Sequence, residues 1–320
     1  MAEFGFYPGY GLSRVNAIVA WLGKPDFLQL HGDIRDWPNF ISSMRGNVDE
    51  SEKYTIDDAK KVGVKLQITQ PAFPRGGNIT DAAAGKYNGY YDDSAKAIDA
   101  ALGDIAYEPV FRSWVEWNGR WMLWSAYTEA DGKKVAAGFR HQVDAFRRYR
   151  PKAIIDWNYN RGEKPPMWGW PGDEYVDVIS WDGYIEAQYV GQEDGAAVFE
   201  RFRTEGYGLD WLANFARSKG KLMAISETGL KSVSDKQGAA YLRAMRAWCV
   251  KNLDVLAWVS PFLETFDPKK SSQWEDVELR ASGNNARPLS MQAMVELRDA
   301  IRGKQPSGAI TPPVVTPPVT

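Results

Sequence analysis

Cysteine and histidine are scarce in this chain, which has one cysteine, Cys249, and two histidines, His31 and His141, among 320 residues. A single cysteine cannot form a disulfide within the chain, so a disulfide-stapled fold is excluded. Three such residues also leave little material for a transition-metal site, and we expect no metal and no cofactor. Cys249 lies in an apolar helical pattern, where a buried packing role is expected.

Long apolar runs and clustered charge of one sign are missing as well. No stretch approaches the about 18 apolar residues of a membrane helix, and the opening MAEFGFYPGYG lacks the regions of a signal peptide. The formal net charge is -2 and no long basic block is present, so neither nucleic acid nor a membrane is expected as a partner. With 44% apolar and 25% charged residues, the composition is that of a globular protein.

Aromatic residues, in contrast, are abundant: there are 14 Trp, 15 Tyr and 13 Phe. A large core accounts for many of them, but several tryptophans lie in polar, glycine-rich segments such as PPMWGWPGD. Flat rings beside polar groups suit the apolar faces and hydroxyl rims of sugars. For any single tryptophan, packing in the core is an equally good interpretation.

Short apolar runs alternate with amphipathic helical patterns through residues 1–303. Eight strand-like runs predict a single-domain (β/α)8 TIM barrel, an α/β fold with a closed parallel sheet. The predicted strands are Phe4–Tyr7, Phe27–Leu30, Lys65–Thr69, Val110–Val115, Ala153–Trp157, Val176–Trp181, Leu222–Ser226 and Val255–Val259. The predicted helices are Leu12–Trp21, Ser94–Leu102, Val135–Tyr149, Leu209–Lys219, Asp235–Asn252 and Ser290–Arg302, with a long loop over Gly183–Gly208.

Residues 304–320 differ from the rest, because they are rich in proline, threonine and valine and repeat the tetrapeptide TPPV. This composition predicts a disordered, extended linker that is separate from the barrel domain. A linker here indicates a further module C-terminal to it. Such linkers are common in secreted multimodular proteins, so an extracellular location is expected, and we expect the barrel to be a monomer.

Two of the predicted strands end in a glutamate. The segment VFRSWVEWNGRWMLW, residues 110–124, carries Glu116, and LMAISETG, residues 222–229, carries Glu227. Glu227 follows Glu116 by 111 residues, which spans three βα units and places the pair on strands 4 and 7, across the barrel mouth from each other. Retaining glycoside hydrolases need such a pair, with one carboxyl to protonate the leaving oxygen and one to attack the anomeric carbon.

Arg112 lies four residues before Glu116, on the same side of the strand. One interpretation is that Arg112 and Glu116 are a structural ion pair, and the other is that the guanidinium favours the ionised form of Glu227. Glu116 would need a raised pKa to act as an acid near neutral pH, which burial beside Trp114 or Trp117 would provide.

The pattern R-x-x-x-E-x-N-G-x-W over Arg112–Trp121, followed by I-S-E-T-G over Ile225–Gly229, resembles glycoside hydrolase family 26. The resemblance covers most of residues 1–303 and includes the segment Val176–Tyr184. It implies a barrel of the clan that carries its acid/base and its nucleophile on strands 4 and 7.

By this resemblance Glu116 is the acid/base, Glu227 is the nucleophile, and Tyr184 is the tyrosine that contacts the nucleophile. Further candidates for binding substrate or supporting the site are Arg112, Trp117, Asn118, Trp121, Trp124, Asn158, Trp181, Asp182, Trp258 and His31. Asn160, in the same segment as Asn158, is a further candidate partner for sugar hydroxyls. Trp258, near the end of the last strand, is expected to form the floor of the subsite for the reactive sugar.

One position departs from the family's pattern, because Val115 stands where the family has a histidine directly before the acid/base. That histidine bears on the subsite of the reactive sugar. The resemblance implies a retaining, endo-acting hydrolase of a β-linked polysaccharide, with β-mannan first and β-1,3-xylan, β-glucan or a bacterial exopolysaccharide as alternatives. The competing hypothesis is a catalytically silent barrel that binds carbohydrate.

Overall fold

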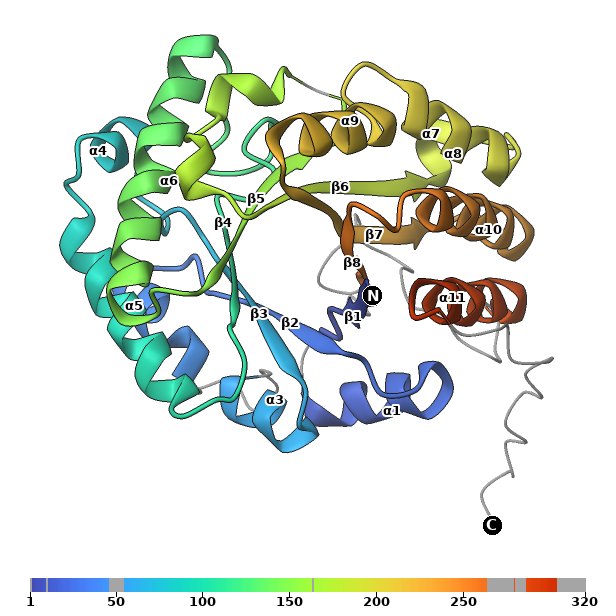
Figure 1. Ribbon diagram of the computed structural model, residues 1–320, viewed down its shortest axis with the longest axis horizontal. Helices are drawn as coiled ribbons and strands as arrows, with labels where there is room; N and C mark the ends of the chain where they lie inside the picture. Colours follow the sequence, from blue (N-terminus) through green and yellow to red (C-terminus); the bar gives the residue numbers. More distant parts are fainter. Residues whose placement is uncertain are drawn as a thin grey trace.

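The computed structural model describes residues 2–9, 11–45, 55–162, 164–263, 279 and 286–303, and it shows a closed barrel of parallel strands in the order β1 to β8. Figure 1 shows the strands at the centre of the molecule with helices around them, and the predicted (β/α)8 fold is confirmed. The strands are β1 (Glu3–Phe6), β2 (Phe27–His31), β3 (Lys65–Gln70), β4 (Val110–Ser113), β5 (Ile154–Asn160), β6 (Val178–Glu186), β7 (Leu222–Lys231) and β8 (Leu256–Pro261). The predicted linker, residues 304–320, lies outside the described residues.

Helices form the outer layer of the barrel. The α-helices are α1 (Leu12–Leu22), α2 (Trp37–Ser42), α3 (Ile56–Val62), α4 (Ile79–Ala83), α5 (Asn88–Leu102), α6 (Glu129–Tyr149), α7 (Ala187–Val190), α8 (Gly195–Thr204), α9 (Leu209–Lys219), α10 (Asp235–Lys251) and α11 (Pro288–Ile301). The short 3-10 helices among the described residues are η1 (Ser43–Arg45), η2 (Pro166–Gly169) and η3 (Asp173–Tyr175). In α6 the buried residues include Val135, Phe139, Val143 and Phe146, which confirms the helical spacing read from the sequence. Cys249 is buried on α10, as expected.

Alternation along each strand divides the side chains between the barrel interior and the helix layer. In β6, Trp181 packs in the main hydrophobic core, whereas Ser180 and Asp182 accept hydrogen bonds from Asn158 of the neighbouring strand. At the end of the interior where the strands begin, the side chains are apolar and form a cluster of Phe27, Val178, Ala224 and Trp258. The polar half of the barrel interior is therefore the half that lies toward the carboxyl ends of the strands.

The strands β6 and β7 run further than the sequence predicted, and they pair as far as Glu186 and Lys231. The prediction of a long loop over Gly183–Gly208 is therefore wrong, because this stretch contains the end of β6 and the helices α7 and α8. Asp194 begins α8 by accepting the backbone N–H of Ala196 at 2.9 Å, a capping signal that the sequence carries.

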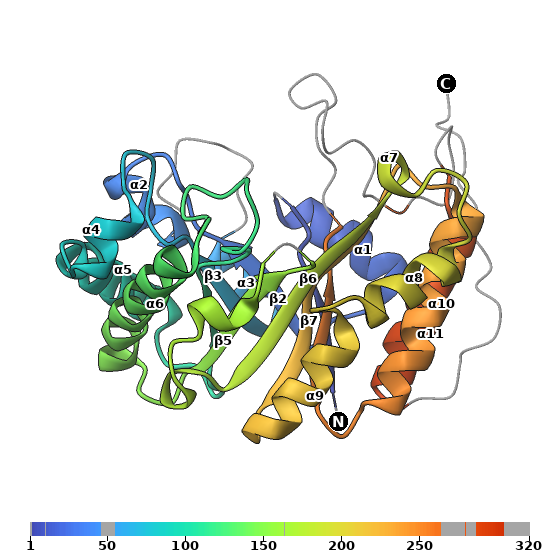
Figure 2. The ribbon, with the colours of Figure 1, turned by 90° about the horizontal axis from the view of Figure 1, so that it is seen from above.

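Figure 2 shows the strands rising from the end of the molecule where the N-terminus lies, so the loops that follow the strands gather at the opposite end. In TIM barrels this carboxyl-end face carries the functional sites. The two glutamates at strand ends therefore lie where a site is expected. None of the helices in the described ranges is both long and apolar enough to span a bilayer.

Candidate active site

Three carboxylates meet near the carboxyl ends of the strands. Glu116 follows β4, Asp182 lies on β6 and Glu227 lies on β7, and one oxygen from each carboxyl lies within 4.8 Å of the others. Glu116 and Glu227 are 6% and 7% exposed, and Asp182 is fully buried. Among the residues that the structure describes, these acidic groups are close enough together to share a cation, but the guanidinium of Arg112 already contacts two of them.

The backbone leaves strand geometry before it reaches Glu116. β4 ends at Ser113, and Trp114 and Glu116 have φ angles of 53° and 51°, in the left-handed region. Residues other than glycine seldom adopt this region, and those that do gather at functional sites. The prediction that the strand continues to Val115 is wrong for this reason. Asn158 holds the turn, because its Oδ1 accepts the N–H of Glu116 at 2.9 Å.

Two N–H donors fix the carboxyl group of Glu116. The indole N–H of Trp121 donates to Oε2 at 2.6 Å, and Nδ2 of Asn160 donates to Oε1 at 2.5 Å. Asn118 positions Asn160, because its Oδ1 accepts the backbone N–H of that residue and its Nδ2 donates to the carbonyl. Gly119 gives the Trp121 ring room to turn back, since a Cβ at this position would lie 2.6 Å from the ring. The pattern E-x-N-G-x-W thus builds the surroundings of one carboxyl.

Glu227 is held by a different set of donors. Nη1 of Arg112 donates to Oε1 at 2.6 Å, and the phenol of Tyr184 donates to Oε2 at 2.6 Å. Nε2 of His31 lies 3.8 Å from Oε1. Gly229 lets the ring of Tyr184 lie against β7, since a Cβ there would be 2.9 Å from the ring. The contact between Tyr184 and Glu227 that the resemblance implies is present, and the roles of these residues stay predictions.

Arg112 connects Glu227 to a buried network inside the barrel. Its Nη2 donates to Asp182, and its Nε lies 3.8 Å from Oδ2 of Asp156. Asn158 donates to Oδ1 of Asp182 at 2.8 Å. Arg112 and both aspartates are fully buried. The observed bond to Glu227 favours the second interpretation of Arg112, in which its positive charge stabilises the ionised form of this glutamate.

The surroundings push the pKa values of the two glutamates in opposite directions. Burial, together with the charge of Glu227, raises the pKa of Glu116 to about 7, although its two N–H donors oppose the rise. Burial alone would also raise the pKa of Glu227, but Arg112 and the other groups around it outweigh burial and hold the pKa below its usual range. Near neutral pH one carboxyl can therefore donate a proton while the other is ionised.

Aromatic rings surround His31 at the barrel mouth. The ring centroids of Tyr7 and His31 are 4.5 Å apart, those of Tyr7 and Phe262 are 4.4 Å apart, and those of Tyr184 and Phe262 are 6.1 Å apart. Burial lowers the pKa of His31 to about 4, so this imidazole is neutral near pH 7. An apolar wall with a neutral histidine therefore adjoins Glu227.

The model of glycosyl hydrolase family 26 matches residues 56–232, which is 177 of the 320 residues of the chain. The chain belongs to this family. The matched region runs from the start of α3 to the end of β7 and includes both glutamates, so the resemblance read from the motifs is confirmed.

Two curated relatives of this family 26 chain are both described as mannan endo-1,4-beta-mannosidase. The one from Bacillus subtilis is 27% identical over 148 residues, which is 39% of this chain and 41% of the relative. The one from Bifidobacterium adolescentis is 27% identical over 196 residues, which is 54% of this chain and 19% of the relative. The aligned part thus spans less than half of either relative.

Among solved structures, the catalytic domain of a family 26 endo-beta-1,4-mannanase from Bacillus sp. JAMB-750 superposes with a TM-score of 0.67 and 17% identity. The superposition covers 93% of this chain and 85% of that one. At this identity the likeness shows the shared fold.

The candidate tryptophans of the family 26 chain lie in two environments. Trp121 is 53% exposed and contacts Glu116, whereas Trp117, Trp124 and Trp181 are at most 3% exposed and pack in the hydrophobic core. These three support the barrel and do not line its mouth. The sequence spacing of Trp117, Trp121 and Trp124 does not predict which of them is exposed, because the loop that carries them has neither helical nor strand periodicity.

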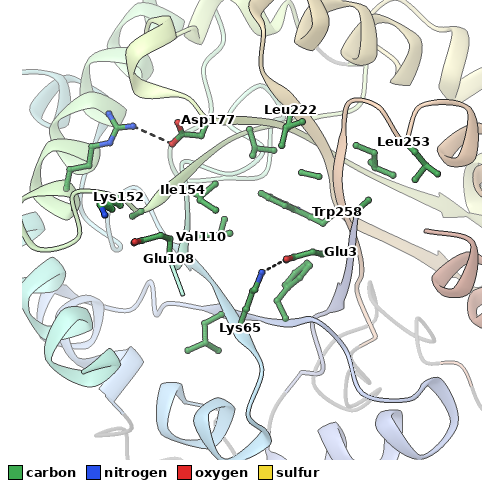
Figure 3. Close-up of a pocket in the computed structure, with 18 of the residues that line it drawn as sticks. Glu3, Lys65, Glu108, Val110, Lys152, Ile154, Asp177, Leu222, Leu253 and Trp258 are labelled. Atoms are coloured by element: carbon green, nitrogen blue, oxygen red, sulfur yellow. Dashed lines mark hydrogen bonds and ion pairs between the residues drawn. The ribbon is translucent and has the colours of Figure 1, made fainter. Parts of the chain in front are cut away.

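The structure corrects the expectation for Trp258, which lies at the end of the barrel opposite the glutamates. It is the third residue of β8, pairs with Glu3 at the start of β1, and donates its N–H to Ser226 at 3.0 Å. Trp258 lines a cavity of about 630 Å³ together with the first residues of several strands. Figure 3 shows Trp258 among these residues, with the ion pair between Lys65 and Glu3 beside it. The strand runs on to residue 261, so Trp258 is too early in it to reach the mouth.

Three residues near the carboxylates were not singled out from the sequence as site residues: Tyr7, Phe262 and Asp156. Tyr7 and Phe262 each come directly after the last residue of a strand, β1 and β8, which is a position that a search for aromatic rings at strand ends would find. Asp156 precedes Asn158 by two residues and so faces the same side of β5. Asn160, a candidate partner for sugar hydroxyls, donates to Glu116, and its contact with sugar stays a prediction.

Proposed function

We propose that this chain is a retaining, endo-acting glycoside hydrolase that cleaves a β-linked polysaccharide, with β-1,4-mannan as the first substrate to test. The observation that carries the proposal is the closeness of Glu116 and Glu227, whose nearest carboxyl oxygens lie within 4.8 Å. Retaining enzymes place the two carboxyls about 5–5.5 Å apart, whereas inverting enzymes leave about 6.5–9.5 Å for a water molecule. The opposite pKa shifts of the pair support the same assignment.

In the first step of the proposed reaction, the ionised carboxylate of Glu227 attacks the anomeric carbon. The bond to the leaving oxygen breaks as Glu116 transfers its proton to that oxygen, which leaves a covalent glycosyl–Glu227 ester and an ionised Glu116. In the second step Glu116 takes a proton from water, and the resulting hydroxide attacks the anomeric carbon. Glu227 leaves as a carboxylate, and Glu116 is protonated for the next cycle.

Residues around the pair supply the conditions that this chemistry needs. Arg112 and Tyr184 keep Glu227 ionised and aimed by their bonds to separate oxygens. Burial keeps a proton on Glu116 near neutral pH, while Trp121 and Asn160 orient its carboxyl. Both curated relatives are named mannan endo-1,4-beta-mannosidase, so β-1,4-mannan is the first substrate to test. Because Val115 stands in place of the family's histidine, β-1,3-xylan, β-glucan and an exopolysaccharide are tested as well.

Product analysis tests the proposal. We would incubate the protein with β-mannan, β-1,3-xylan, mixed-linkage β-glucan and an exopolysaccharide, and follow the first products by proton NMR. β-Anomers that appear before mutarotation are expected, and α-anomers would overturn the retaining assignment. Fragments of several lengths are expected from the start of digestion, whereas release of one sugar at a time would overturn endo action.

Variants of the two glutamates separate their roles. Glu116→Ala should lower kcat/KM on polysaccharide by about 10²–10⁴-fold, because a general acid is lost. The same variant should keep much of its first step on an aryl glycoside, whose leaving group needs no proton, and azide should accelerate it and give a β-glycosyl azide. Glu227→Ala should abolish turnover on both substrates, and no azide product of retained configuration should form.

A catalytically silent carbohydrate-binding barrel is the second candidate, and Val115 favours it because the family's histidine is absent there. Hydrolysis that disappears in Glu227→Ala while glycan binding persists would support the enzyme. Binding without turnover by the unaltered protein would support the binding barrel. The monomeric state, the extracellular location and a module beyond the linker stay predictions.

A further inference from the structure

The loop between β4 and α6, residues 114–128, presents apolar side chains to solvent next to Glu116. Trp121, Leu123 and Tyr127 are 53%, 48% and 60% exposed. Met167, on the neighbouring η2, is 42% exposed. Exposed apolar side chains that gather on a soluble protein mark binding surfaces. Trp121 contacts Glu116 directly, so the surface is continuous with the candidate active site.

Hydrogen bonds across the loop bring Tyr127 back toward the carboxyl. The backbone N–H of Ala126 donates to the carbonyl of Trp117 at 2.8 Å, which places residue 127 beside the turn that carries Glu116. The phenol of Tyr127 donates to the carbonyl of Arg120 at 3.5 Å. Tyr127 is therefore anchored to the same short segment of backbone that positions the predicted acid/base.

Lys164 fixes one face of the Tyr127 ring. Its Nζ lies 4.9 Å from the ring centroid and donates to the carbonyl of Gly119 at 3.3 Å and to that of Asn118 at 3.5 Å. A cation over an aromatic face is attractive, and here the cation is itself tied to the loop. Because the residue is 60% exposed, much of the ring stays open to solvent. A ring that is held before binding loses little conformational entropy when a ligand stacks on it.

The loop belongs to the side of the site that meets the leaving group. Glu116 protonates the leaving oxygen in the proposed reaction, and the loop reaches its carboxyl through Trp121. Glu227 is held from other elements, by Arg112 of β4 and Tyr184 of β6. Rings that extend outward from Glu116 along its own loop are therefore placed to meet sugars beyond the scissile bond.

We propose that Tyr127 is the aromatic platform of a second leaving-group subsite, on which the pyranose next but one to the reactive sugar stacks its apolar face. This inference rests on the proposed function. The occupant is the reducing-end part of the β-linked chain, beyond the sugar that carries the leaving oxygen. Stacking there selects long chains over short ones and favours cleavage inside the polysaccharide.

Subsite mapping tests the platform. We would measure kcat/KM for β-1,4-manno-oligosaccharides of four to six sugars, with 18O at the reducing end so that mass spectrometry identifies each cleaved bond. Tyr127→Ala should lower kcat/KM about tenfold for binding modes that place two or more sugars on the leaving-group side. For an aryl β-mannotrioside, whose leaving group is a single ring, the change should be less than twofold. Tyr127→Phe keeps the stacking face and the cation of Lys164 but loses the 3.5 Å bond to the carbonyl of Arg120, so its kcat/KM should fall by no more than about twofold.

Leu253→Ala is the matched control, because it removes an exposed apolar side chain at the opposite end of the barrel. It should leave every cleavage pattern unchanged. An equal loss of kcat/KM on the aryl glycoside and on long chains in Tyr127→Ala would overturn the platform, and so would an unchanged distribution of products. Circular dichroism of each variant identifies a loss of folding.

Failure of the proposed function gives a different result from failure of the platform. If the unaltered protein hydrolyses none of the polysaccharides, the proposed function is wrong. The platform is then decided by calorimetric titration of hexasaccharides of β-mannan, β-1,3-xylan and β-glucan into the unaltered protein and Tyr127→Ala. Weaker binding of one of them by the variant would support the platform, and equal or undetectable binding in both proteins would overturn it.

Discussion

The indole N–H of Trp121 donates to Oε2 of Glu116 at 2.6 Å, while 53% of the tryptophan stays exposed. A hydrogen bond that is donated to a carboxyl oxygen favours the ionised form, so this contact lowers the pKa of Glu116 against the effect of burial. An exposed side chain therefore adjusts the proton affinity of the predicted acid. A ligand that displaces Trp121 would also change that affinity.

Trp121→Phe should move the alkaline limb of the kcat/KM profile to higher pH. The variant keeps an aromatic ring and loses the donor, so the pKa of Glu116 rises from about 7, and the protonated acid persists to higher pH. The shift should be about half a pH unit, because the bond is partly open to solvent. Kinetics between about pH 5 and 9 measure it.

Trp124→Phe is the control for this change. It removes an indole N–H from the same loop, but that donor bonds to the carbonyl of Val115 at 2.7 Å and not to a carboxylate. The alkaline limb should stay in place in the control. An unmoved limb in Trp121→Phe would contradict the assignment of Glu116 as the titrating acid.

Tyr184→Phe should weaken catalysis and shift the acid limb to higher pH. The phenol donates to Oε2 of Glu227 at 2.6 Å and lowers its pKa, so without the bond the nucleophile takes up a proton at a higher pH. Hydrogen bonds to charged groups contribute about 1.5–3 kcal/mol, which corresponds to a loss of about 10- to 100-fold in kcat/KM.

Gly229→Ala offers a second route to the same effect. A Cβ at this position would lie 2.9 Å from the Tyr184 ring and would displace it from Glu227 without removing the hydroxyl. Its acid limb should move in the same direction as that of Tyr184→Phe. Opposite shifts in the two variants would show that the phenol does not act through Glu227.

The sequence was sufficient to predict the barrel and the place of Glu116 and Glu227. Both follow apolar runs at βα spacing, and in a parallel barrel the ends of all such runs meet at one face. Arg112 does face the barrel interior, where it contacts Glu227, but the alternation that was used to pair it with Glu116 stops at Ser113, where β4 ends. Its partner was ambiguous, since the sequence does not show how far each strand of the barrel is staggered against the next.

The sequence did not predict the places of Trp258 and of the tryptophans after β4, for two reasons: neighbouring strands of the barrel are staggered, and the backbone after β4 is irregular. Trp258 is three residues from the end of β8, but the stagger of the barrel puts it beside Glu3 at the start of β1. Trp121 and Trp124 are three positions apart in one loop, and only the first reaches Glu116. The left-handed φ angles of Trp114 and Glu116 break the strand period there, so no periodic rule predicts which ring turns outward.

Arg112→Met should lower the free energy of unfolding by about 3–5 kcal/mol at pH 7. Arg112 is fully buried and contacts Glu227 and Asp182, so its loss leaves buried carboxylates without a counter-charge. Urea denaturation followed by tryptophan fluorescence measures the change. The loss should become smaller as the pH falls, because the carboxylates can then take up protons.

Arg148→Met is the matched surface control. Arg148 pairs with Asp92, and its side chain is 54% exposed, so solvent weakens the attraction. The control should change the free energy of unfolding by less than about 1 kcal/mol. Equal effects of the two substitutions would contradict a special role for the buried network.

Asp156 should make the folded protein less stable as the pH rises from about 4.5 to about 6. Burial raises its pKa from 3.8 to about 6, although Arg112 and nearby donors oppose the rise. The folded state then binds a proton that the unfolded chain has already released, so the stabilisation is full below the unfolded pKa and disappears as the pH passes 6. A rise of this size in the pKa corresponds to about 3 kcal/mol in the free energy of unfolding.

Asp156→Asn tests this dependence, because an amide of similar shape does not titrate. His31 and Glu116 also contribute to the pH dependence of stability between pH 4.5 and 6, in both proteins. The free energy of unfolding of the variant minus that of the unaltered protein, from urea titrations, should therefore rise with pH across this window. Asp92→Asn is the control. Arg148 lowers the pKa of Asp92, so the contribution of Asp92 to the free energy of unfolding changes only below pH 3.8, outside this window. The pKa of Glu227 is also lowered, so its contribution to the free energy of unfolding likewise changes only below pH 4.5. An unchanged slope in Asp156→Asn would mean that Asp156 stays ionised beneath Arg112 throughout, with its charge fully balanced by the guanidinium.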